Sequence, residues 1–106
     1  MKHSVWVAFD LGVNGDYEGM YTWLDKQKAK ECGDNVSFFE YKYGTDLLPD
    51  IKKDIQSAVS LNQKSRVYLI HLVQGKMKGS FIFGSRRNAP WAGFAGIGDQ
   101  TEDSDA

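Results

Sequence analysis

The sequence predicts an α+β fold, a two-layer sandwich in which two helices lie on one face of a single sheet. Three observations predict it. A chain of 106 residues is long enough for one hydrophobic core and too short for two ordinary domains. Two segments have the three-and-four spacing of amphipathic helices. Several others have strand patterns, and the elements follow in the order strand, helix, strand, helix, strand, strand.

The first strand is expected over residues 4–11, with the sequence SVWVAFDL. Val5 and Val7 fall on one face, while Trp6 and Asp10 fall on the other, and this period of two is typical of a strand. Both faces carry apolar residues. We therefore expect this strand at the centre of the sheet.

The first helix is expected after the turn GVNGD, whose last residue, Asp16, is placed to cap it. Apolar residues recur in it every three or four positions and form one stripe along the helix. The stripe comprises Tyr17, Met20, Tyr21, Leu24 and the stem of Lys28. This helix is expected to end near ECGDN, residues 31–35.

The second helix is expected to begin at Thr45 or Asp46 and to fray over residues 60–65. Pro49 fits its first turn, where a missing amide donor costs little. The buried stripe is formed by Leu48, Ile51, Ile55, Ala58 and Val59.

The remaining strands are predicted from β-branched and aromatic runs. Residues 36–44 form either one half-exposed strand or a hairpin. Residues 66–73 are nearly continuous apolar, as expected of a central strand, and His71 lies among them as a core or interface histidine. QGKMKG, residues 74–79, then turns the chain into a last strand beginning at residue 80.

These elements favour a ferredoxin-like arrangement, or a near variant, as one domain over residues 1–96. The sheet face without helices would carry Trp6, Asp10 and some of the aromatic residues between 38 and 43. Exposed aromatic surface usually finds a partner, and a two-fold contact needs only self-complementarity. A homodimer through this face is expected.

The charges are unevenly distributed. The net charge is -1, yet the last eight residues carry four acids and no base, which leaves 10 acids and 13 bases, or +3, elsewhere. Residues 97–106 are predicted to be a disordered acidic tail.

No apolar run approaches a membrane span and no signal-peptide pattern follows Met1, so no membrane association and a cytoplasmic location are expected. The lone Cys32 has no partner for an internal disulfide.

Four short motifs carry a resemblance to a known family: VWVAFDL, the Gly/Asn turn, DYEGMYTWL and the late PWAGF. Together they resemble small bacterial ferredoxin-like proteins related to the CRISPR-associated endoribonucleases and the virulence-associated protein D family. The resemblance implies that Asp10 is the strand-end aspartate of that family. In a dimer, Asp10 would meet its symmetry mate, hold Mg²⁺ and serve as the catalytic residue of a metal-dependent endoribonuclease.

Asp10 also has a simpler interpretation, in which it ends a strand and accepts hydrogen bonds from the amides of the following turn. The two interpretations separate two functions. One is a dimer that binds or processes nucleic acid. The other is a non-catalytic protein-interaction or regulatory module, similar to an antitoxin.

Nucleic-acid binding, to RNA or DNA, would use a basic edge made by Lys76, Lys78, Arg86 and Arg87. Tyr41, Tyr43 or Trp91 would stack on bases. The alternative for the basic residues is a solvated face of the fold.

Overall fold

The computed structural model describes residues 1–96, so the expected tail at 97–106 lies outside the described residues. The elements are β1 (Lys2–Asp10), α1 (Tyr17–Lys26), β2 (Lys30–Gly33), β3 (Val36–Lys42), α2 (Leu47–Ala58), β4 (Arg66–Val73) and β5 (Lys76–Phe83). Within residues 1–96, no helix has the length and apolar character needed to cross a membrane.

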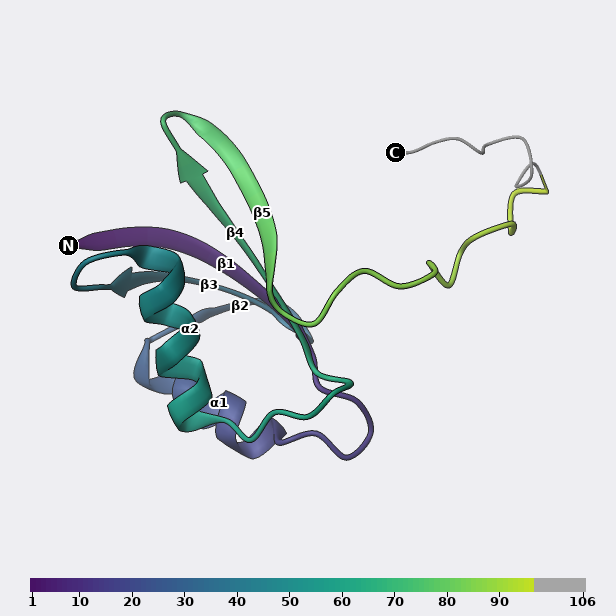
Figure 1. The fold of residues 1–106 in the computed structure, drawn as a ribbon, viewed down its shortest axis with the longest axis horizontal. Helices are drawn as coiled ribbons and strands as arrows, with labels where there is room; N and C mark the ends of the chain where they lie inside the picture. Colours follow the sequence, from purple (N-terminus) through teal and green to yellow (C-terminus); the bar gives the residue numbers. More distant parts are fainter. Residues whose placement is uncertain (97–106) are drawn as a thin grey trace.

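The five strands form one sheet in the order β2-β3-β1-β4-β5, and every neighbouring pair is antiparallel. Both helices lie on the same side of this sheet (Figure 1). The α+β class and the two-layer arrangement are therefore confirmed. The βαββαββ order has one strand more than the βαββαβ order of the ferredoxin-like fold, so the topology is not the canonical one.

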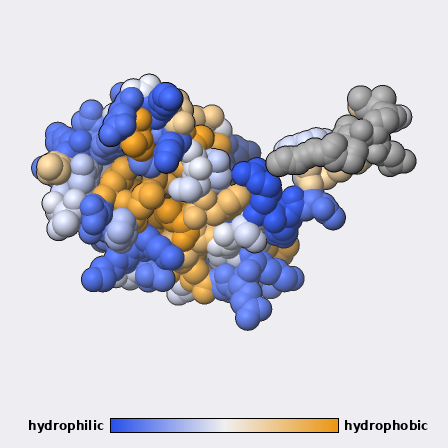
Figure 2. Space-filling view, turned by 45° about the horizontal axis from the view of Figure 1, so that its top comes forward, coloured by the Kyte–Doolittle hydropathy of each residue, from blue (hydrophilic) through white to orange (hydrophobic). Residues whose placement is uncertain are grey.

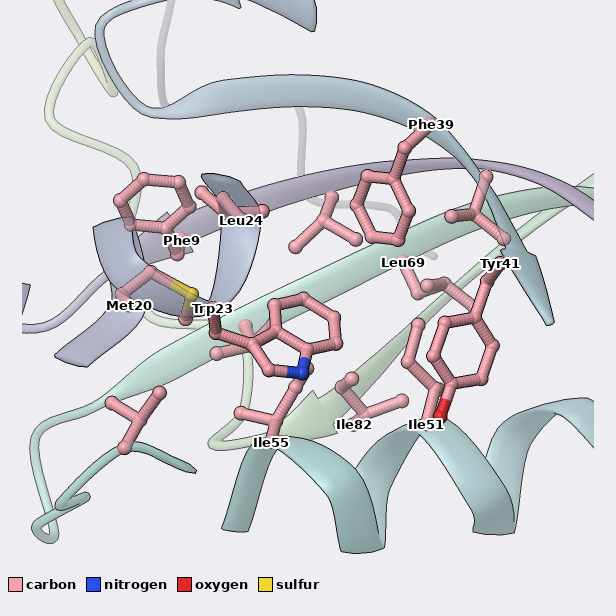
Figure 3. Close-up of a cluster of buried hydrophobic side chains, with 14 of the residues drawn as sticks. Phe9, Met20, Trp23, Leu24, Phe39, Tyr41, Ile51, Ile55, Leu69 and Ile82 are labelled. Carbon is pink, nitrogen blue, oxygen red and sulfur yellow. The ribbon is translucent and has the colours of Figure 1, made fainter. Parts of the chain in front are cut away.

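The core lies between the helices and the sheet (Figure 3). The expected alternation in β1 is confirmed, because Val5 and Val7 are fully buried while Trp6 and Asp10 on the other face are only partly buried. Ile51 and Ile55 from α2 are also fully buried. Burial of apolar side chains from the helices and from the sheet provides most of the stabilisation of such a sandwich.

Helix α1 is shorter than expected, and the prediction that it ends near residues 31–35 was wrong. It ends at Lys26, and Lys28 then adopts a φ of 56°, the left-handed conformation that commonly terminates a helix. The following residues form β2, which pairs with β3 as a hairpin across Asp34 and Asn35. Residues 36–42 form one strand, so the single-strand alternative for residues 36–44 is the correct one, and β2 is a strand that the sequence did not predict.

The buried face of α1 is also rotated from the expected stripe. Trp23, which the stripe omitted, is 3% exposed and packs edge-to-face against Phe39, whereas Tyr21 is 52% exposed. Met20 and Leu24 are buried as expected. Trp23 therefore takes the place in the buried face of α1 that the expected stripe gave to Tyr21.

The sheet face without helices is largely apolar. Five side chains from β1, β3, β4 and β5 form its middle, which is called the uncovered face here: Trp6, Phe38, Tyr68, Ile70 and Phe81. The Trp6 and Phe38 rings lie 4.8 Å apart, as do those of Tyr68 and Phe81. Figure 2, in which the top of Figure 1 comes forward, shows hydrophobic surface bordered by hydrophilic side chains.

The β4–β5 hairpin turns at Gln74 and Gly75, both of which have positive φ, as a two-residue hairpin turn requires. The hairpin rises away from the layer of helices (Figure 1). Its tip is exposed, and Leu72 and Met77, which face each other across the two strands, are 44% and 56% exposed.

Residues 84–96 leave the end of β5 and extend away from the body of the protein (Figure 1). Turns within this segment are closed by backbone hydrogen bonds, such as the one that the Phe94 amide donates to the Trp91 carbonyl. Trp91 and Phe94 are 74% and 85% exposed.

Replacing Ile55 with Ala tests the core. Ile55 is fully buried and the cavity cannot close completely, so the change should lower the free energy of unfolding by about 2–5 kcal/mol in a urea titration. Gln56→Ala, at an exposed neighbouring position, is the control and should stay within about 0.5 kcal/mol. Equal effects of the two changes would contradict this description of the core.

Candidate functional site

Asp10 lies at the end of β1, and the sheet register places Arg66 of β4 directly opposite. The Arg66 guanidinium donates to Oδ2 of Asp10 at 3.2 Å, and Arg87 lies 3.9 Å from the same oxygen. The Gly12 amide donates to Oδ1 at 3.2 Å. The carboxylate is therefore held from both sides, by a cross-strand arginine and by the backbone of its own turn.

These contacts lower the pKa of Asp10 below its ordinary value. The hydrogen bond from Arg66 is the largest cause, the bond from the Gly12 amide is the next, and slight burial opposes both. The side chain remains half exposed. Asp10 is therefore an ionised carboxylate that faces solvent at the sheet end.

A metal ion at Asp10 would need further ligands from outside residues 1–96 of the same copy. Among residues 1–96, no group of three His, Cys, Asp or Glu side chains could hold an ion. Carboxylate oxygen is a ligand type that Mg²⁺ prefers, but both Asp10 oxygens already accept hydrogen bonds. A cation would have to share this carboxylate with Arg66 or displace it.

Asp16 fixes the loops around this site. As expected, it caps α1 by accepting a hydrogen bond from the Gly19 amide at 2.9 Å. Its other oxygen accepts from the Ser60 amide beyond α2, also at 2.9 Å, and these bonds lower its pKa, with the Ser60 bond the larger cause. A shallow depression lies between the two loops, lined in part by Asp10, Asn62 and Lys64.

The four basic residues of the expected edge do not form one surface. Lys76 and Lys78 lie beside the hairpin turn, whereas Arg86 and Arg87 follow the other end of β5. Five residues of β5 follow Lys78, so at about 3.3 Å per residue the strand separates the pairs by at least roughly 16 Å. Arg87 instead belongs to a basic cluster at the Asp10 end of the sheet that includes Lys64 and Arg66. Arg86 lies over the Phe81 ring, 5.7 Å from its centroid. The Arg66 position was not predicted, since only the strand register reveals it.

The three aromatic candidates also lie apart. Tyr41 is buried, and its hydroxyl donates to Oδ2 of Asp54 at 3.0 Å, while burial and this carboxylate raise its pKa. Tyr43 packs at the edge of the core near His3. Of the three rings, Trp91 is the one presented openly to solvent.

His71 is a buried residue on β4, in accord with its expected place in the core or an interface. Burial lowers its pKa, and the nearby His3 imidazole, with a ring separation of 5.6 Å, adds to this effect. His71 lies toward the hairpin tip, while Asp10 lies at the opposite end of β1, since His71 pairs with Val5 and Asp10 pairs with Arg66. The histidine and the aspartate therefore do not form one site.

No known protein family, no curated protein and no solved structure matches this chain.

Replacing Asp10 with Asn tests the ion pair through pH. Because the folded pKa of Asp10 is lowered, its ionised form stabilises the fold above the unfolded pKa of about 3.9, and that contribution disappears as the pH falls through the folded value. At pH 7, Asp10→Asn should therefore melt at a lower temperature than the parent. This gap should narrow toward pH 3, as measured by circular dichroism.

Asp34→Asn, at an exposed turn position, is the matched control and should show no such gap. A gap for Asp10→Asn that persists unchanged at pH 3 would show that its ionisation does not stabilise the fold.

Proposed function

We propose that the protein is a homodimeric interaction module in which two copies associate through the uncovered face. The observation that carries this proposal is the continuous apolar surface made by Trp6, Phe38, Tyr68, Ile70 and Phe81 on the side that lacks helices. An apolar surface of several strands rimmed by polar groups is typical of a binding site.

The side chains of this face are held in place before binding. Trp6 packs on Phe38, and the Tyr68 ring covers Gly79 on the next strand, where an added Cβ would clash with it. Rings that are already ordered lose little conformational entropy on association. This arrangement supports a defined interface in preference to a loose hydrophobic contact.

The edges of the sheet favour a face-to-face contact over strand addition at β5. Lys76 and Lys78 lie on the edge strand β5, and charged side chains on an edge strand discourage pairing with another chain. A second copy supplies an identical apolar face, so a two-fold axis through Ile70 and its neighbours satisfies both copies at once. The same sheet face thus gives a closed dimer.

The dimer is tested by charge substitution. Light scattering after gel filtration should give twice the 11.9 kDa chain mass for the parent protein. Ile70→Asp should give a monomer, because it places a carboxylate at the centre of the contact. Val13→Asp is the control, since Val13 is 99% exposed in a loop, and it should remain dimeric.

A monomeric parent at tens of micromolar, with a native circular dichroism spectrum, would contradict the proposed dimer. A dimer that survives Ile70→Asp would place the contact elsewhere.

A second candidate function is nucleic-acid binding, with metal-dependent RNA cleavage as its catalytic form. The basic cluster around Asp10 favours it, since Lys64, Arg66 and Arg87 outnumber the one acid there. Trp91 follows on the exposed C-terminal segment and offers a stacking surface. Asp10 from two copies would supply the Mg²⁺ ligands in this function.

Salt dependence tests the second candidate. Binding of a single-stranded RNA should weaken with salt by a log-log slope of roughly -0.7 per phosphate contact. Arg87→Gln should make that slope shallower by about 0.7 because one contact is lost. Lys53→Gln, at an exposed position of α2, is the control and should leave the slope unchanged. Absence of binding at low salt would reject this candidate.

The same preparation distinguishes a nuclease from a simple binder. If two Asp10 carboxylates hold Mg²⁺, the ion should raise the melting temperature and support RNA cleavage, and Asp10→Asn should abolish both effects. A melting temperature that Mg²⁺ does not change, together with RNA that stays intact, would reject the catalytic form.

A further inference from the structure

A second basic surface lies at the opposite edge of the molecule from β5. Five lysines line one hollow between the end of α1 and the strands β1 to β3, and this surface is called the lysine hollow: Lys2, Lys26, Lys28, Lys30 and Lys42. Glu40 is the one acid among the residues that line it. The charge of this lining is therefore +4, on a protein whose net charge is -1.

The lysines are largely without acidic partners. Lys2 lies 4.0 Å from Glu40, and within residues 1–96 no other lysine of the hollow has a carboxylate within that distance. Like charges gathered in this way repel one another and favour binding of an anion. Lys28 also has the positive φ that ends α1, which places it against the hollow in a conformation that glycine or asparagine usually adopts.

The hollow also contains an open strand edge. β2 pairs with β3 between Val36 and Phe38, but β3 continues to Lys42. From Phe39 onward, the side of β3 away from β1 has no strand partner among the described residues. Peptide groups along such an edge can pair with an added extended segment. The hollow therefore offers lysine charges and a backbone edge together.

The chain itself contains a segment of matching chemistry. Residues 99–106, DQTEDSDA, carry Asp99, Glu102, Asp103 and Asp105 and no base. The four side-chain carboxylates of this segment and the five lysines of the hollow are complementary in charge.

The length of the chain allows this segment to reach the hollow of its own molecule. The registers place Phe83, the last residue of β5, about 27 Å from Lys42, from three strand spacings across the sheet and seven residues along it. In the structure, residues 84–96 extend away from the body of the protein, so docking requires this segment to turn back. Fully extended, the sixteen residues from Phe83 to Asp99 span about 53 Å, which exceeds the distance to Lys42. A tethered segment also acts at millimolar effective concentration, which favours it over a free anion.

We propose that the acidic segment 99–106 docks in the lysine hollow of the same chain, with its carboxylates against Lys26, Lys28 and Lys30 and its backbone along the open edge of β3. This contact does not depend on the proposed dimer or on nucleic-acid binding.

The protein provides its own probe for this contact. Cys32 is the single cysteine, it is exposed, and it lies two residues from Lys30 on β2. A nitroxide spin label on Cys32 of the full-length, ¹⁵N-labelled protein should broaden the amide signals of residues 99–106 relative to a diamagnetic label. At high salt the broadening should disappear, because the Debye length falls to about 3 Å at 1 M.

Matched charge reversals locate the contact. Lys26→Glu with Lys28→Glu should abolish the broadening, whereas Lys52→Glu with Lys53→Glu, on exposed positions of α2, should leave it unchanged. Retained amide signals from β1 and β4 would confirm that each variant is folded. Sharp tail signals in the parent at low salt, or broadening that survives in the Lys26 and Lys28 variant, would overturn the proposal.

A mixed sample separates the occupants. When spin-labelled ¹⁴N chains are combined with unlabelled ¹⁵N chains, docking within one chain leaves the ¹⁵N tail signals sharp. Broadening in this sample to the extent seen in the singly prepared protein would show docking onto a second copy and overturn the proposal. So would a single-stranded RNA that shifts the amides of the hollow while the tail signals never broaden.

Discussion

The register of β1 between β3 and β4 is the constraint on which the rest of the structure depends. Because side chains alternate along a strand, this register directs Val5 and Val7 toward the helices and Trp6 and Asp10 away from them. A slip of one residue would exchange the two sets. The hydrophobic core, the uncovered face and the pairing of Asp10 with Arg66 are consequently three results of a single alignment.

Much of this fold could be predicted from local sequence, since β1 and α2 have clear periods and Asp16 has the chemistry of a cap. The β2 strand could not, because KECG is short, polar and almost fully exposed, and nothing in it alternates. Trp23 was missed for a related reason. Helical spacing admits both Trp23, three positions after Met20, and Tyr21, four after Tyr17, and the packing of α1 against Phe39 decides between them.

The candidate site shows a similar limit. A carboxylate after an apolar strand identifies Asp10, but its partners Arg66 and Arg87 come from positions 56 and 77 residues later in the chain. Lys78 and Arg86 were predicted to share one basic edge because they are close in the sequence. The extended strand β5 keeps them apart. Within β3 the period of two is informative, because Tyr41 enters the core while Phe38 shares the other face with the charged Glu40.

The exposed tip of the β4–β5 hairpin has a consequence for how the molecule moves. Few buried contacts hold Leu72 and Met77, so the tip can open at a lower free energy than the sandwich beneath it. Amide hydrogens at the tip should exchange with solvent through this local opening, while those of β1 should exchange only through global unfolding. The hairpin can therefore change shape against a partner, or tolerate a longer turn at Gln74 and Gly75, without disturbing the core.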